Sequence, residues 1–266
     1  MEEETAHMLP ALFIAHGSPM VAIEETEYSR FLQQLGKSFP KPSTIVVFSA
    51  HWESRVQMVS EVSRYSIIYD FGGFPEELYR IQYSAPGNRD VSRQIQQLLG
   101  RYQISYGVET SRGLDHGAWT ILRRLYPDAD IPVVELSVNP RILPEEQYWI
   151  GKALALLRAD NVLIIGSGVT VHNFQLLAVR ADPKVGEIVN GFENWLESHL
   201  KTWDLSALFD FEAQAPYARI AVPPGGNEHF VPLFYAMGAA DDSREAHTLY
   251  RGLEMGVLTN SVYQFG

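Results

Sequence analysis

The sequence predicts a three-layer α/β/α fold, a single domain in which helices cover both faces of a mixed central sheet. Short apolar runs rich in β-branched residues alternate with stretches in which apolar residues recur at helical spacing. The apolar runs contain few polar positions, which is typical of strands buried on both faces. No linker, charge block or internal repeat interrupts the alternation. We therefore expect one domain over residues 1–266, with residues 1–8 as a flexible tail.

The central element of the prediction is the stretch 44–53, Thr-Ile-Val-Val-Phe-Ser-Ala-His-Trp-Glu, which begins with a five-residue buried strand. Further strands are predicted at 11–15, 55–62, 103–108, 131–138 and 161–165, and the last stretch, 248–265, is expected to close the sheet. Helical spacing, with caps, glycines or prolines near the ends, predicts helices at 24–35, 88–100, 115–126, 144–158, 185–200 and 230–237.

The composition argues for a globular protein and against nucleic-acid binding. Hydrophobic residues make up 46% of the chain, enough for a substantial core. The chain has 21 Lys and Arg against 32 Asp and Glu, a net charge of −11, and no basic cluster offsets this locally. An acidic surface repels phosphate backbones and anionic lipids, so we expect neither nucleic acid nor a membrane as a partner.

The chain contains no cysteine, which excludes disulfides, thiolate metal sites and a cysteine nucleophile. Residues 1–8 lack the basic and apolar segments of a signal peptide, and no apolar run approaches the length of a membrane span. These features predict a cytoplasmic protein.

Three predicted strands are each followed by a histidine. His16 follows the strand at 11–15, His51 follows the central strand, and His172 follows the strand at 161–165 after a Gly-Ser-Gly segment. Ligands of open α/β sheets bind beyond the carboxyl ends of the strands. The three histidines are therefore expected to meet at one site.

Five of the eight histidines lie at element boundaries beside small or polar residues: His16, His51, His116, His172 and His229. The others, His7, His199 and His247, lie in the tail, on a surface-type helix and in a polar stretch, and we assign them no function. Imidazole suits zinc and ferrous iron, and a non-haem iron site typically combines two histidines with a carboxylate. The strand-end histidines could form such a set with Glu228 or His229.

Two acidic residues are candidates for orienting the histidine rings from behind. Asp115 and Glu53 could fix a ring tautomer as partners of metal ligands. Their alternative roles are a helix cap for Asp115 and a surface charge for Glu53.

The Gly166-Ser-Gly168 segment does not predict a nucleotide site or a serine nucleophile. It is interpreted as a turn after a strand, where a phosphate could bind. It lacks the full Gly-x-Gly-x-x-Gly pattern and the lysine of a P-loop. Ser167 also lacks the Gly-x-Ser-x-Gly sequence of a nucleophile elbow.

Residues 65–75 form an aromatic, glycine-rich segment without periodicity. One interpretation is an ordinary Gly-Gly loop held down by its aromatic side chains. The other is a lid over a pocket for an aromatic ligand, since loops on rigid scaffolds often carry function.

These motifs together resemble the DODA-type extradiol ring-opening dioxygenases, the 4,5-DOPA dioxygenase-like branch of the LigB-like superfamily. The resemblance covers about residues 9–266. It depends on six ordered segments: Ala11-Leu-Phe-Ile-Ala-His-Gly-Ser-Pro-Met20, Ser49-Ala-His-Trp52, Tyr69-Asp-Phe-Gly-Gly-Phe-Pro75, Leu114-Asp-His-Gly-Ala-Trp119, Val171-His-Asn173 and Glu228-His229.

The resemblance implies one divalent metal, Fe(II) for ring cleavage or Zn(II) as the bound species. The implied metal residues are His16, His51, His172 and His229. His172 either completes a zinc-bound set or acts as an acid/base. Because related enzymes use a carboxylate as third ligand, Glu228 and its neighbour His229 remain alternatives for that position.

The resemblance further implies that the substrates are a catechol and O2, and that His172 and His116 are catalytic. A neutral His172 or His116 would accept a phenolic proton while the ring is opened beside the diol to a muconic semialdehyde. Aromatic side chains could wall the ring pocket: Trp52, Phe71, Phe74 and Trp119. Two alternatives remain, a zinc-dependent hydrolase on the same scaffold and a non-catalytic metal- or phenol-binding protein.

Overall fold

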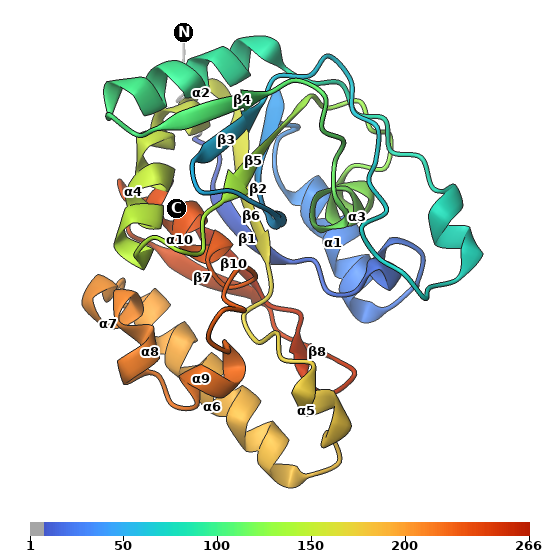
Figure 1. Ribbon diagram of the computed structural model, residues 1–266, viewed down its shortest axis with the longest axis vertical. Helices are drawn as coiled ribbons and strands as arrows, with labels where there is room; N and C mark the ends of the chain where they lie inside the picture. Colours follow the sequence, from blue (N-terminus) through green and yellow to red (C-terminus); the bar gives the residue numbers. More distant parts are fainter. Residues whose placement is uncertain (1–7) are drawn as a thin grey trace, which may run out of the picture.

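A computed structural model describes residues 8–266 and contains a mixed sheet of eight strands in the order β4-β3-β5-β2-β6-β1-β10-β7 (Figure 1). Its strands are β1 (Ala11–Ala15), β2 (Thr44–Glu53), β3 (Gln57–Ser60), β4 (Tyr106–Glu109), β5 (Val133–Val138), β6 (Val162–Gly168), β7 (Ala246–Tyr250) and β10 (Val262–Phe265). A separate pair consists of β8 (Leu253–Glu254) and β9 (Leu258–Thr259). The sheet has helices on both faces, which confirms the predicted fold class.

The centre of the sheet is parallel. The neighbours β5, β2, β6 and β1 run in one direction, so their carboxyl ends lie at one edge. The predicted closing segment does extend the sheet: β10 pairs antiparallel with β1, and β7 pairs antiparallel with β10. On the other side, β3 pairs antiparallel with β5 and parallel with β4.

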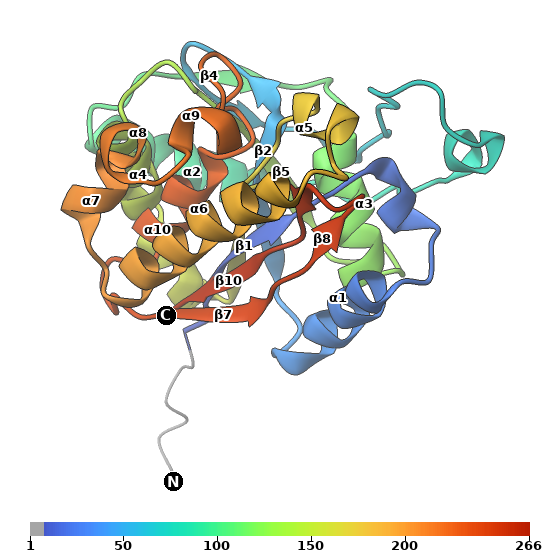
Figure 2. The ribbon, with the colours of Figure 1, turned by 90° about the horizontal axis from the view of Figure 1, so that it is seen from below.

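The helices form the outer layers, seen from below in Figure 2. They are α1 (Glu27–Ser38), α2 (Arg89–Arg101), α3 (His116–Leu125), α4 (Pro144–Ala153), α5 (Gln175–Ala178), α6 (Pro183–Lys201), α7 (Leu205–Phe209), α8 (Phe211–Gln214), α9 (Ala218–Ala221) and α10 (Pro232–Gly238). Short 3₁₀ helices are η1 (Pro19–Ala22), η2 (Glu76–Arg80) and η3 (Ala155–Asp160).

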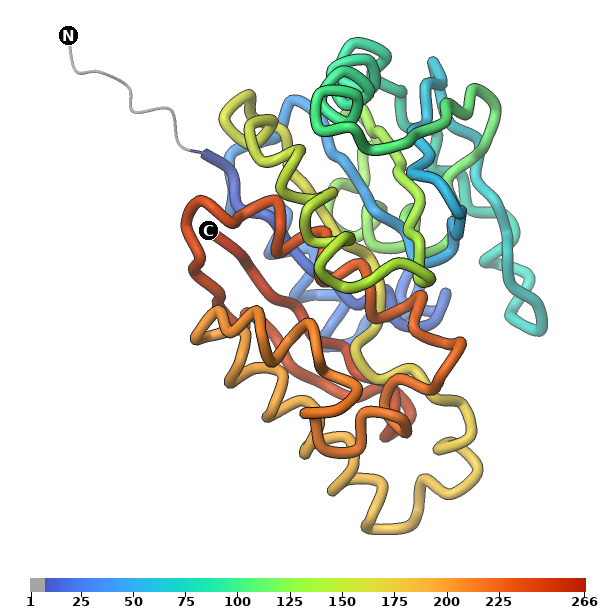
Figure 3. The backbone as a smooth tube through the Cα atoms, turned by 60° about the vertical axis from the view of Figure 1, so that its left-hand side comes forward, coloured from blue at the N-terminus to red at the C-terminus, as the bar shows by residue number. Residues whose placement is uncertain are grey.

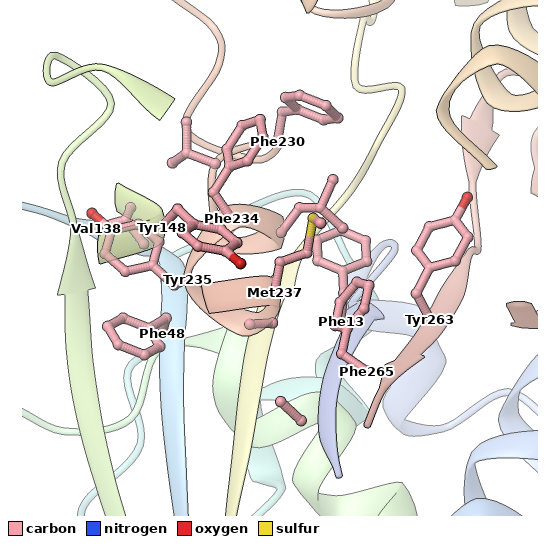
Figure 4. Close-up of a cluster of buried hydrophobic side chains, with 14 of the residues drawn as sticks. Phe13, Phe48, Val138, Tyr148, Phe230, Phe234, Tyr235, Met237, Tyr263 and Phe265 are labelled. Carbon is pink, nitrogen blue, oxygen red and sulfur yellow. The ribbon is translucent and has the colours of Figure 1, made fainter. Parts of the chain in front are cut away.

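Alternation along each strand divides the core between the two faces. In β1, Leu12 and Ile14 pack with α1 and α3, whereas Phe13 packs with the cluster that includes α2, α4, α6 and α10. Figure 4 shows this second cluster, in which Phe48 of β2 stacks on Tyr235 of α10 with ring centroids 4.5 Å apart. Both faces of the parallel strands are thus buried, as their apolar runs predict.

Helix α10 lies unusually close to the sheet because glycines face it. A Cβ atom at Gly166 would lie 2.2 Å from the carbonyl oxygen of Pro232, and one at Gly168 would lie 2.1 Å from that of His229. The predicted Gly-Ser-Gly turn is therefore wrong: β6 runs through Gly168 and pairs with β1 there. The physical role of these glycines is close helix–sheet packing rather than a change of chain direction.

Four other elements differ from expectation in their bounds. Strand β2 does not stop before His51 but continues to Glu53, which pairs with Val138 after an irregularity in the ladder. The helix expected at 144–158 ends at Ala153 and is followed by η3, which Asn161 terminates in a left-handed conformation with φ of 58°. The strands predicted at 55–62 and 103–108 are present but shorter, as β3 and β4.

Residues 61–88 project from the body of the molecule without a long helix or strand (Figures 1 and 3). The segment carries η2 and is tied to the body by isolated bridges such as Ile67 with Leu114. Among residues 8–266 no helix combines the length and apolar character needed to cross a bilayer. Residues 1–7 of the expected tail, His7 among them, lie outside the described residues.

Candidate metal centre

Three histidine side chains meet at the carboxyl edge of the parallel strands. The Nε2 atoms of His16 and His51 are 3.1 Å apart, and those of His51 and His229 are 3.3 Å apart. His16 directly follows β1, His51 lies in the last part of β2, and His229 lies in the turn before α10. The fold therefore brings together residues far apart in the chain: His51 and His229 are separated by 178 positions.

The other ring nitrogen of each histidine faces an oxygen. The Nδ1 atom of His16 is 3.1 Å from Ser167 Oγ, whose own hydrogen is donated to the Gly117 carbonyl at 2.5 Å. Since a hydroxyl has only one hydrogen, Ser167 accepts from Nδ1–H of His16. Nε2 of His16 is then unprotonated and can act as a ligand.

Carboxylates occupy the same position behind the other two rings. Asp70 Oδ2 lies 3.4 Å from Nδ1 of His51, and Glu228 Oε1 lies 2.9 Å from Nδ1 of His229. Glu228 hydrogen-bonds to Nδ1 of His229, and Asp70 makes a longer charged contact with Nδ1 of His51. A carboxylate beside Nδ1 favours the tautomer with hydrogen on that atom, which leaves Nε2 free to bind a metal. All three Nε2 atoms are thus prepared as acceptors.

The arrangement fits a divalent metal ion. Unprotonated nitrogens so close together repel one another unless a cation lies among them. Metal–nitrogen bonds of about 2.0–2.1 Å place neighbouring ligand nitrogens about 2.9–3.4 Å apart in octahedral or tetrahedral geometry. The observed separations of 3.1 and 3.3 Å fall within that range.

Burial keeps these rings neutral, which is the form that binds metal. Desolvation, followed by the proximity of the other histidines, lowers the pKa of His16 and His229 well below the usual value. For His51, desolvation and His116 lower the pKa to about 4, although nearby carboxylates, including Asp70, oppose the shift.

Two further histidines flank the cluster. The His116 ring lies 3.9 Å from that of His51, centroid to centroid, and the His172 ring stacks on His229 at 3.6 Å and 14°. Potential ligand atoms of His16, His51 and His116 lie within 4.8 Å of one another, as do those of His172, Glu228 and His229. The structure thus brings all five predicted histidines together.

The geometry distinguishes the alternatives left open for Glu228 and His229. The ring of His229 enters the cluster, whereas Glu228 hydrogen-bonds to its outer nitrogen. A carboxylate is therefore present, but behind a histidine, and the converging set is all nitrogen.

His172 differs from the converging histidines in its hydrogen bonding. Neither of its ring nitrogens hydrogen-bonds to another described residue, while its backbone N–H donates to the Ala221 carbonyl. Desolvation, followed by the neighbouring His229, lowers the pKa of His172 to about 3. His172 therefore offers a neutral imidazole with both nitrogens accessible beside the cluster.

The residues that orient the rings are not those expected from the sequence. Asp115 caps α3 and accepts from Ser49 Oγ at 2.6 Å, whereas Glu53 is exposed and its side chain makes no hydrogen bond with a described residue. Asp70 and Ser167 face the rings instead. Neither position carried a sequence signal beyond its presence in a recognisable motif, because each contact depends on tertiary packing.

Asp115 nevertheless helps to position His51, through Arg112. Arg112 Nη2 donates to the His51 carbonyl at 3.2 Å and forms an ion pair with Asp115 at 3.0 Å. Gly117 lets α3 approach closely, since a Cβ there would lie 2.9 Å from a carbon of the His51 ring. His51 is thus packed firmly against the start of α3.

The proposed aromatic wall is only partly present. Phe71 lies edge-on to His116 with centroids 5.6 Å apart, and Phe74 packs on Phe71 at 5.5 Å. Trp119 is fully buried and donates to the Ile68 carbonyl, so it supports the loop from beneath. Trp52 is buried under the guanidinium of Arg112, 5.0 Å from its ring centroid.

Comparisons with known proteins show the family of this chain. The family model described as the catalytic LigB subunit of aromatic ring-opening dioxygenase matches residues 10–265. The 4,5-DOPA dioxygenase extradiol of Beta vulgaris is 39% identical over 257 residues, covering 95% of each chain. The protein of the same name from Escherichia coli K12 is 35% identical over 264 residues, covering 97% of this chain and 95% of that one.

A solved structure confirms the fold. The crystal structure of an uncharacterized protein from Escherichia coli K12 superposes with a TM-score of 0.79 at 31% identity, covering 97% of this chain and 100% of that one. The fold and the matched family together define an aromatic ring-opening dioxygenase. The chain belongs to the LigB family, as the sequence motifs indicate. Membership implies an aromatic, catechol-like substrate and O2.

Proposed function

We propose that the protein is an extradiol dioxygenase that opens the ring of a catechol with O2 at a mononuclear non-haem Fe(II) site, giving a muconic semialdehyde. DOPA and related catechols are the first candidate substrates because relatives over nearly the full length carry that substrate in their names. The reaction adds both atoms of O2 to the ring and consumes no external reductant.

The observation that carries the proposal is the convergence of three unprotonated Nε2 atoms, from His16, His51 and His229. Three ligands on one side of a metal would leave positions open for substrate. When bound there, Fe(II) supplies Lewis acidity and redox chemistry that brings catechol and O2 together.

We assign proton transfer to His172. Ring opening requires a catechol oxygen to lose its proton, and a neutral imidazole beside the site can accept it. Neither ring nitrogen of His172 hydrogen-bonds to another described residue, so a nitrogen of this ring is available to a substrate oxygen. Its stacking on His229 holds the ring beside the metal ligands.

His116 is the second catalytic candidate, with a positioning rather than a basic role. Its Nδ1 atom lies 3.0 Å from Asp70 Oδ1, so Nε2 is the atom left to face a substrate oxygen. Phe71, edge-on to His116, offers an apolar surface against which a catechol ring could lie.

Oxygen uptake tests the proposal. Metal-free protein would be loaded anaerobically with Fe(II) and mixed with a panel of catechols that includes DOPA. It would then be exposed to air while the visible spectrum is followed. We expect stoichiometric O2 consumption with a new yellow chromophore. The matched controls are His51→Ala, expected to be inactive, and His247→Ala, which removes an exposed histidine of β7 and is expected to be fully active.

The all-nitrogen set is also suited to zinc, which keeps one competing function in view. A zinc-dependent hydrolase would use metal-activated water and turn over without O2. Turnover of an ester or amide under nitrogen by the zinc-loaded protein, with no O2 uptake by the iron-loaded protein, would replace the dioxygenase proposal.

A further inference from the structure

Asp70 contacts two site histidines at once. Its Oδ2 atom lies 3.4 Å from Nδ1 of His51, and its Oδ1 atom lies 3.0 Å from Nδ1 of His116. Oδ1 also accepts a hydrogen bond from the backbone N–H of His116 at 2.9 Å. One carboxylate therefore lies against both a proposed metal ligand and a proposed substrate-facing ring.

Asp70 belongs to the projecting segment rather than to the sheet or its helices. The chain on either side of it is held by specific contacts: Ile68 N–H donates to the Leu114 carbonyl, and Tyr69 Oη donates to the Ile81 carbonyl at 2.7 Å. Trp119 Nε1 donates to the Ile68 carbonyl at 3.1 Å. These contacts fix the backbone on which Asp70 reaches the two rings.

The contact with the His116 backbone places Asp70 at the start of α3. The first N–H groups of a helix have no partner within the helix, and a carboxylate there is favourable. Asp115 accepts a hydrogen bond from the backbone N–H of Ala118 at 3.2 Å, and Asp70 accepts one from the backbone N–H of His116. The two acids therefore fix the helix start that carries the His116 ring.

We propose that Asp70 is a positioning residue that aligns His51 and His116. Through it, the order of residues 65–80, the part of the projecting segment around Asp70, is coupled to metal binding at the histidine cluster. The proposal assumes the metal site of the proposed function, but not its reaction. It assigns the segment a role beyond that of a wall beside the substrate.

A substitution can separate the two contacts of Asp70. In Asp70→Asn, one amide oxygen can still accept from the His116 backbone, so the helix start and the loop remain supported. The amide nitrogen is a donor and cannot accept from Nδ1–H of His51. If Asp70 only capped α3, the asparagine would preserve metal binding. If it aligns His51, affinity falls.

The test measures metal affinity directly, without turnover. Co(II) and Zn(II) binding to the full chain would be measured by competition with a chelator, and the Co(II) absorption spectrum would be recorded. We expect Asp70→Asn to bind about 10–100-fold more weakly, the range for loss of a partner behind a metal-ligating histidine, with an altered Co(II) spectrum. Asp70→Glu, which keeps the charge, should recover part of the affinity.

Glu77→Gln is the matched control. It removes the same charge from the same segment, at an exposed residue of η2 that makes no side-chain hydrogen bond with a described residue. Unchanged affinity in this variant would show that the effect of Asp70 is specific. An equal loss in both variants would overturn the proposal, as would an Asp70→Asn protein that binds Co(II) within about twofold of the wild type.

Hydrogen exchange tests the coupling itself. Metal binding should slow amide exchange within residues 65–80 of the wild type, and this protection should be lost in Asp70→Asn at saturating metal. Equal protection in both proteins would contradict the coupling. Wild-type protein that binds metal with this protection but opens no catechol would refute the proposed function and leave the role of Asp70 intact.

Discussion

The histidine cluster consists of two groups that are supported in different ways. In the first, His16 and His51 lie at the ends of parallel strands, and the carboxylate behind His51 comes from Asp70 in a distant segment. In the second, His229 and its carboxylate Glu228 are adjacent in the chain. In both groups the Nδ1 atom of a ring faces an oxygen on the side away from the cluster. Only in the second group does that oxygen belong to the neighbouring residue in the sequence.

The two groups therefore depend on different contacts and should be disrupted by different substitutions. The first depends on the sheet for its rings and on the projecting segment for its carboxylate. The second depends on the close contact of the turn before α10 with the end of β6, where Val169 N–H donates to the His229 carbonyl at 2.7 Å. Substitutions that affect one support should leave the other group in place.

The largest effect is expected from removing a converging ring. His51→Ala deletes the nitrogen that lies near both other Nε2 atoms, so we expect loss of stoichiometric metal binding and of turnover. Metal content after dialysis and O2 uptake measure the two effects. A folded variant that kept both its metal and its activity would show that the cluster is not the metal site.

Substitution of His172 is expected to change metal affinity little but to lower kcat strongly. His172→Gln keeps a side chain of similar size but removes the proton acceptor, which should lower kcat by about 10²–10⁴-fold. Metal affinity should remain close to that of the wild type. If affinity instead fell as far as in His51→Ala, His172 would be a metal ligand rather than a base.

Next in size is the effect of the local carboxylate. Glu228→Gln should weaken metal binding about 10–100-fold, because the amide supports the Nδ1 hydrogen of His229 less well than a carboxylate does. Unlike Asp70→Asn, it should not alter hydrogen exchange in residues 65–80. Equal disturbance of that segment by both variants would show that the two groups are not independently supported.

A separate effect, measured on the metal-free protein, is the pH dependence of its stability. The pKa values of His51 and His172 are lowered to about 4 and about 3 in the folded state, so below the unfolded value near 6.5 protons favour the unfolded chain. Above about pH 6.5 the two rings are neutral in both states and do not lower the free energy of unfolding. As the pH falls from 6.5 toward 4, that free energy decreases, because the unfolded chain binds the protons first.

We expect each of the two histidines to cost on the order of 3 kcal/mol of unfolding free energy between pH 7 and pH 4. Urea unfolding at a series of pH values measures it. His172→Gln should show a shallower pH slope than the wild type, and identical slopes in the two proteins would contradict the assignment.

Much of the architecture could be predicted because strands and helices follow local periodicity. The errors occurred where tertiary contacts override local signals. Gly166 and Gly168 were interpreted as a turn because glycine favours turns, yet here they allow α10 to approach a strand. The histidines could be predicted because they share a context of small or polar residues at element boundaries, three of them after predicted strands. Asp70 could not, since a lone aspartate in an irregular loop has no period.

The sequence by itself determined the fold class, the five histidines and the family, because hydrophobic periodicity and ordered motifs are properties of the chain alone. The tertiary structure decided which ring nitrogens converge, that Glu228 stands behind His229, and that Asp70 and Ser167 orient the rings. These contacts join residues far apart in the chain, such as His51 and His229, which are separated by 178 positions. No local pattern specifies them, because they exist only once the parallel strands align their ends and α3 and α10 pack against them.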